Sequence, residues 1–123
     1  MNTPVKNFYD LDAWKEARKL CFLLYQKTKK FPKDELFGLT SQIRRSAVSV
    51  TANIAEGFGR ISIKEKLNFY NQALGSLIEV QSHIFIISDL GYLMKDEIKE
   101  IFTASQKVQS ILLGFIRPTR KRL

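Results

Sequence analysis

Apolar residues recur every three or four positions through four long segments of the chain, which is the spacing of one face of an α-helix. The segments run from about residue 10 to 30, 34 to 57, 62 to 90 and 95 to 116. The stripe of the first segment consists of Leu11, Trp14, Ala17, Cys21, Leu24 and Thr28. No segment shows a sustained alternation of apolar and polar residues, so the sequence predicts no strand.

Capping residues and helix breakers indicate where these helices begin and end. Asp34 is predicted to cap the second helix, because its carboxylate would accept free N–H groups of the first turn. Ser62 and Glu65 form the capping-box pattern at the start of the third helix. The residues expected to end the four helices are Pro32, the pair Gly57 and Gly59, Gly91, and Pro118.

The four amphipathic helices and their short connections predict an all-α fold. Helices of some twenty residues joined in this way pack as an antiparallel, up-down-up-down four-helix bundle. We expect residues 1–123 to form this single domain, with a basic tail at residues 117–123. In this topology the end of the fourth helix lies beside the connection between the second and third helices.

The chain carries an excess of positive charge. Twenty Lys and Arg residues against twelve Asp and Glu residues give a net charge of +8, which attracts polyanions such as RNA or DNA. The same charge could serve only solubility, and the tail could be a frayed end. Basic residues cluster in the tail, in the first loop and at the junction of the second and third helices. Candidate phosphate contacts are Arg44, Arg45, Arg60, Lys64, Arg117, Arg120, Lys121 and Arg122.

Polar residues accompany the apolar stripes of the second and third helices. They lie beside small residues such as Gly75, which would let another backbone approach closely. The predicted role is a second packing surface, within the chain or between subunits, and the alternative is a solvated face. Its members are Gln42, Ser49, Asn53 and Glu56 on the second helix and Ser76 and Glu79 on the third.

The sequence lacks the side-chain patterns of a metalloenzyme or a nucleophilic enzyme. Di-iron bundles use Glu and His three residues apart, whereas the single histidine, His83, lies four residues after Glu79. Cys21 lies in an apolar stripe with no histidine in its helix, as inert packing cysteines do. Residues 57–60, Gly-Phe-Gly-Arg, lack the preceding strand and the spacing of a phosphate-binding loop. We therefore expect no catalytic residue, no metal and no cofactor.

The chain shows no feature that predicts a membrane or secreted location. No stretch is expected to span a membrane, and the first ten residues lack the apolar core of a signal peptide. A single cysteine precludes a disulfide within the chain, which suits a reducing compartment. We expect a cytoplasmic protein.

Several motifs together resemble one known family. The stretches FPKDELFGLTSQIRRSAVSVTANIAEGFGR (residues 31–60), ALGSLIEVQSH (residues 73–83) and LGYL (residues 90–93) are quite specific in combination. They resemble the bacterial four-helix-bundle proteins encoded within intervening sequences of 23S ribosomal RNA genes. The similarity extends from Tyr9 to Leu93, and the last helix agrees only in pattern.

The resemblance implies a bundle that assembles into a homo-oligomeric ring, commonly a pentamer. The family is similar to the accessory variability determinant protein of diversity-generating retroelements, a basic pentameric bundle that binds nucleic acid and its reverse transcriptase. The leading hypothesis is a non-enzymatic, oligomeric bundle that binds RNA or DNA with little sequence preference. The alternative is a scaffold or adaptor for a reverse transcriptase or an RNA-processing partner, without direct nucleic-acid binding.

Overall fold

The computed structural model describes residues 4–123, and it confirms an all-α protein. Four α-helices follow one another along the described chain: α1 (Asp12–Thr28), α2 (Leu39–Gly59), α3 (Ile63–Leu90) and α4 (Lys95–Lys121). A 3-10 turn, η1 (Phe8–Asp10), precedes α1, and a second, η2 (Lys33–Glu35), lies between α1 and α2. No strand occurs among residues 4–123.

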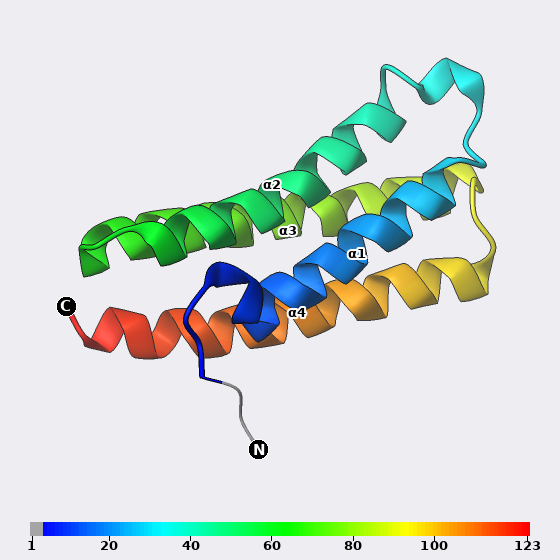
Figure 1. The fold of residues 1–123 in the computed structure, drawn as a ribbon. Coiled ribbons are helices and arrows are strands. Elements are labelled where there is room, and N and C mark those ends of the chain that lie inside the picture. Colours follow the sequence, from blue (N-terminus) through cyan, green and yellow to red (C-terminus); the bar gives the residue numbers. More distant parts are fainter. Residues whose placement is uncertain (1–3) are drawn as a thin grey trace.

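The helices run up, down, up and down as a four-helix bundle, as predicted (Figure 1). The α1–α2 and α3–α4 connections lie at one end of the bundle. The α2–α3 turn lies at the other end, together with the carboxyl end of α4. We call this second end the turn pole and the first end the loop pole. The largest side chains that are almost completely buried along the centre are Leu20, Leu24, Ile43, Ile54, Tyr70, Leu77, Ile84, Ile87, Ile101, Leu112 and Ile116.

The start of α2 differs from the sequence prediction. Asp34 does not cap the helix, because residues 33–35 form a separate 3-10 turn and α2 begins only at Leu39. Glu35 takes the capping role: its Oε1 accepts a hydrogen bond from the Leu39 N–H at 3.3 Å. Its Oε2 accepts a hydrogen bond from the Tyr92 hydroxyl at 2.7 Å. Glu35 therefore joins both connections of the loop pole.

The end of α4 also differs from the prediction. We expected Pro118 to stop the helix, but α4 continues through it to Lys121. Packing explains the continuation, because Leu112, Ile116 and Thr119 extend one buried stripe past the proline. The Thr119 hydroxyl also donates to the Phe115 carbonyl oxygen at 2.8 Å. The predicted basic tail is thus mostly the last turn of a packed helix.

The glycines that were expected to end α2 and α3 behave differently from one another. Gly91 ends α3 in the left-handed conformation with φ of 71°, as predicted. Ser62 caps the start of α3, since its Oγ accepts the Glu65 N–H at 3.1 Å. Gly57 and Gly59, however, do not stop α2, which includes both residues. The chain leaves the helix at Arg60, which has an extended backbone.

Gly57 is required for close packing. A Cβ at this position would lie 2.4 Å and 2.6 Å from two ring carbons of Tyr70. Tyr70 is only 1% exposed and packs on Phe115 of α4, with ring centroids 4.6 Å apart. The glycine therefore allows α2 to pack closely on α3, and the Tyr70 ring in turn contacts α4.

Helix α3 is the one helix among residues 4–123 that is long and apolar enough to be considered as a membrane span. Helix α3 is long enough, with a mean hydropathy of 1.2 over an 18-residue window, to span a membrane by length and composition alone. Its apolar residues are explained by the bundle, because Leu77, Val80, Ile84 and Ile87 are buried in the shared core. The core helix of a soluble protein passes the same test, and we describe α3 as a bundle helix.

Replacing Gly57 by alanine should destabilise the fold. The new methyl group must displace the buried ring of Tyr70, and overpacking of this kind costs about 1–3 kcal/mol. Urea denaturation measures the free energy of unfolding. Gly59→Ala is the matched control, because a Cβ there meets no atom within 4 Å and alanine favours the helix. Equal stability of Gly57→Ala and the wild type would contradict this packing argument.

Glu97 stabilises the loop pole by charge. Its Oε1 accepts the Met94 N–H at 3.1 Å at the start of α4, and its Oε2 pairs with Lys30 and with Lys27, the latter at 3.4 Å. Hydrogen bonds from Lys30 and from the Met94 backbone lower the pKa of Glu97 from 4.5 to about 2. This carboxylate therefore links α4 to the end of α1.

The stability contributed by Glu97 should depend on pH. A lowered pKa in the folded state means that the contribution is complete above about pH 4.5 and is lost as the pH falls toward 2. Thermal unfolding should show that Glu97→Gln lowers the Tm at pH 7, and that the difference from wild type shrinks between pH 4.5 and 2. Asp96→Asn, in the same turn, is the control. A difference that stays constant with pH would contradict the proposed ion pairs.

Candidate nucleic-acid interface

The turn pole collects most of the excess positive charge. Residues 56–67 and 115–123 contain seven Lys or Arg residues and two acidic residues. The predicted candidates that the fold brings to this pole are Arg60, Lys64, Arg117, Arg120, Lys121 and Arg122. All six are exposed. The two segments that carry them are far apart in the sequence but lie at the same end of the bundle (Figure 1).

Lys66 adds a charge that the sequence analysis did not count among the candidates. Its Nζ donates to the carbonyl oxygens of Gly57 at 3.3 Å and Phe58 at 2.8 Å, at the negative end of the α2 dipole. Burial and then the nearby charge of Arg122 lower the pKa of Lys66. The signal in the sequence was its place in the basic cluster at the junction of the second and third helices, four residues after Ser62.

Arg60 is held in place by its neighbours. Its guanidinium lies 3.1 Å from a carboxylate oxygen of Glu56 and 4.6 Å from the ring centroid of Phe69. Glu56, predicted as an interface residue, thus orients Arg60 within one chain. The two side chains remain 42% and 57% exposed, so Arg60 stays accessible to a ligand.

The loop pole carries nearly as many basic residues but is electrically balanced. Residues 27–35 and 89–100 contain six Lys residues and six acidic residues. Lys27 lies 2.9 Å from Glu100, and Lys30 contacts Glu97. The lysines of the first loop therefore add little net positive field, and the two ends of the bundle differ in charge.

Arg44 and Arg45 lie apart from the turn pole. Arg44 lies on α2, sixteen residues before Arg60 at the end of that helix, which corresponds to about 24 Å along the helix. The Arg44 Nε donates to Thr28 Oγ1 at 2.8 Å, and its guanidinium stacks 4.6 Å above the Tyr25 ring. Arg44 thus links α2 to α1. Arg45 is exposed on α2, and its side chain has no hydrogen bond or ion pair within residues 4–123.

The predicted polar surface lies largely between α2 and α3 of the same chain. Ser49 and Ser76 hydroxyl oxygens are 2.9 Å apart, and Asn53 Nδ2 donates to Ser49 Oγ at 3.0 Å. Glu79 Oε1 accepts a hydrogen bond from Ser46 at 2.7 Å. Small hydroxyl side chains here allow the two helices to approach closely while their polar groups remain paired.

Gln42 takes a different position from the other predicted members of this surface. Its side chain is exposed, and only its backbone oxygen joins the network, by accepting the Ser46 hydroxyl at 2.9 Å. Ser46 itself is buried and was absent from the predicted set. Its place on the helical wheel beside Ser49 and Asn53 was the available signal.

No group of three metal-binding side chains comes together within residues 4–123. His83 Nε2 lies 3.4 Å from Glu79 Oε1 on the same helix. Partial burial raises the pKa of the Cys21 thiol above its ordinary value, which disfavours the reactive thiolate. These arrangements pack and pair side chains and do not form a recognisable catalytic set.

Comparisons with known proteins agree with this fold. Residues 9–114 match the sequence profile of the 23S rRNA-intervening sequence protein family. The crystal structure of a protein of unknown function from the S23 ribosomal protein family of Bacteroides thetaiotaomicron is similar, with a TM-score of 0.78 at 20% identity. The alignment covers 85% of this chain and 95% of that one. No curated protein sequence matches the chain.

The profile match spans all of α1, α2 and α3 and most of α4. It thus includes the polar contacts between α2 and α3 and the α2–α3 turn with Arg60 and Lys64, while the last basic residues of α4 lie beyond it. The chain belongs to the 23S rRNA-intervening sequence protein family.

Proposed function

We propose that this protein is a non-enzymatic bundle of the cytoplasm that binds RNA or DNA through its turn pole. The observation that supports the proposal is the unbalanced charge there, seven basic residues against two acidic ones. The loop pole, with six of each, provides the contrast within the same molecule.

The geometry of the turn pole suits phosphate contacts. Arg117, Arg120 and Lys121 project from a packed helix, so less conformational entropy is lost on binding than from a frayed tail. The candidates include no aromatic base reader and point to contacts with the backbone of the nucleic acid. The expected binding has little sequence preference and depends strongly on salt.

Removing charge from the turn pole should weaken binding. In the triple variant Arg120→Gln, Lys121→Gln and Arg122→Gln, three candidate phosphate contacts are lost at exposed positions. The slope of log K against log salt for duplex binding should become shallower by about 3, since each phosphate contact contributes about 0.9. Fluorescence anisotropy over a salt series measures this slope.

The matched control removes the same charge from the loop pole. Lys33, Lys95 and Lys99 are all exposed, and none forms an ion pair among the described residues. Their triple replacement by glutamine should leave most of the slope in place. Equal losses in the two triple variants would show that only net charge matters and would contradict a specific turn-pole interface.

A second proposal concerns assembly, and it is supported by the outer surface of α3. Residues 67–94 contain no Lys or Arg, although the chain has twenty. Four large apolar side chains on this helix are about half exposed or more: Ile78, Phe85, Ile86 and Leu90. Gly75 is exposed in open space, so another backbone could come close. We propose that this surface joins copies of the chain in a homo-oligomer, with a pentameric ring as the expected form.

Charges placed on the α3 surface should disrupt the oligomer. Ile78→Glu with Ile86→Glu introduces two carboxylates at positions that are half exposed in the single chain, so the bundle should still fold. Light scattering should then report a monomer. The control pair, Phe37→Glu and Ile61→Glu, alters two apolar residues that are more than 90% exposed away from this surface.

Light scattering also distinguishes the proposed homo-oligomer from the adaptor hypothesis. A wild-type monomer would contradict assembly through α3 and would leave this surface free for a different protein. Recovery of a protein partner after nuclease treatment, with no binding of nucleic acid at low salt, would favour a scaffold or adaptor over the function proposed above.

A further inference from the structure

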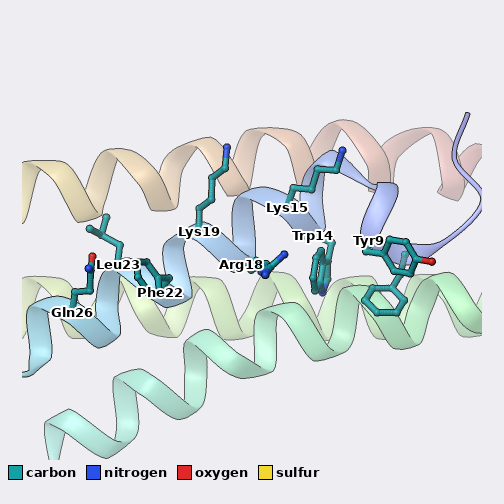
Figure 2. Close-up of a pocket in the computed structure, with 9 residues that line it drawn as sticks. Tyr9, Trp14, Lys15, Arg18, Lys19, Phe22, Leu23 and Gln26 are labelled. Atoms are coloured by element: carbon teal, nitrogen blue, oxygen red, sulfur yellow. The ribbon is translucent and has the colours of Figure 1, made fainter. Parts of the chain in front are cut away.

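A groove lined by aromatic and basic side chains runs along α1, and neither the sequence candidates nor the turn-pole proposal includes it. Figure 2 shows Trp14, Arg18 and Phe22 along one side of α1, with Tyr9 of the preceding turn beyond Trp14. Lys15 and Lys19 extend along the other side of the helix. The groove has a volume of about 1150 Å³, above the roughly 300–1,000 Å³ of typical small-ligand pockets.

The aromatic side chains of the groove are unusually accessible. Phe22 is 66% exposed and Tyr9 is 52% exposed. Trp14 is partly exposed and packs on the ring of Phe8, with centroids 5.1 Å apart. Because large aromatic side chains gain free energy when they are removed from water, a row of them on one surface indicates a contact site.

The groove adjoins the turn pole. Phe8 lines both this groove and a small hollow that also contains Arg60 and Gly59. In the other direction, Phe22 also lines a third hollow that reaches Lys29 at the end of α1. From Trp14 to Lys29 the strip follows α1 for about 22 Å, the length of about six stacked bases.

The charges of the groove favour an anionic occupant. Lys15, Arg18 and Lys19 line it, and Arg18 lies 5.5 Å from the ring centroid of Trp14. The nearby carboxylate of Glu16 is shared between Lys19 at 3.3 Å and Lys107 at 3.5 Å. An apolar segment of another protein would bury Arg18 and Lys15 without partners, which is costly.

We propose that this groove binds single-stranded nucleic acid by stacking, as an extension of the turn-pole interface. Bases stack on Tyr9, Trp14 and Phe22, Arg18 contacts the phosphates between them, and Lys15 adds positive charge from the other side of α1. The inference rests on the proposed function, because the same strand passes from the turn pole into the groove. Paired bases are unavailable for such stacking, so the groove selects unpaired strands.

The test compares a short oligouridylate with an RNA duplex of the same length, using the double variant Tyr9→Ala and Phe22→Ala. Loss of two stacking platforms should weaken single-strand binding by about thirtyfold or more and leave duplex binding unchanged. The salt slope should also be unchanged, because no charge is removed. Trp14 is the only tryptophan of the chain, so the oligouridylate should quench the intrinsic fluorescence of the wild type.

The control is Phe37→Ala, which removes an aromatic side chain that is 92% exposed at the loop pole. It should bind both RNAs as the wild type does. Unchanged single-strand affinity in the double variant would overturn the inference. The proposed function would still stand if the turn-pole triple variant made the salt slope of binding shallower. Absence of any binding by the wild type would overturn both. Conversion of the double variant to a smaller oligomer would overturn the inference by identifying a second copy as the occupant.

Discussion

The contact of Gly57 with the Tyr70 ring is the constraint on which the turn pole depends. Tyr70 lies in α3, touches α2 where Gly57 lacks a side chain, and packs on Phe115 of α4. The basic residues follow closely in the sequence, since Arg60 comes three residues after Gly57 and Arg117 two residues after Phe115. One buried ring thus sets the relative positions of three helices and of the charges at their ends.

The surface of the bundle is divided by charge in a way that composition alone does not reveal. The net charge of +8 is concentrated at the turn pole, whereas ion pairs to Glu97 and Glu100 neutralise lysines of the loop pole. Residues 67–94, which include most of α3, contain no Lys or Arg. Because cations are absent there and abundant at the turn pole, the two surfaces are suited to different partners, other protein chains and a polyanion.

Periodicity predicted the parts of the fold that depend on local spacing. The four helices, Ser62 as a cap and Gly91 as a stop follow from patterns within a few residues. The predicted start of α2 and the predicted end of α4 were wrong, because contacts between distant segments determine where these helices begin and end. Pro118 is retained inside α4 by the buried residues around it, and Glu35 replaces Asp34 as the cap of α2.

The sequence predicted which types of residue form the candidate interface better than it predicted which individual residues belong to it. Arg60 and the residues of the last helix share a pole because an up-down topology returns α4 to the α2–α3 turn. The role of Arg44 was not visible in the sequence, since its partners Thr28 and Tyr25 lie on another helix. The aromatic groove was missed for a similar reason: Tyr9 precedes α1, and only the folded chain places it beside Trp14.

Lysine footprinting of the complex with RNA tests the central claim most directly. Acetylation rates are measured for each lysine at low salt with and without an excess of RNA. The account predicts that Lys64 and Lys121 at the turn pole are protected, while Lys33, Lys95 and Lys99 at the loop pole react as in the free protein. Protection spread evenly over both poles, or confined to the loop pole, would contradict it.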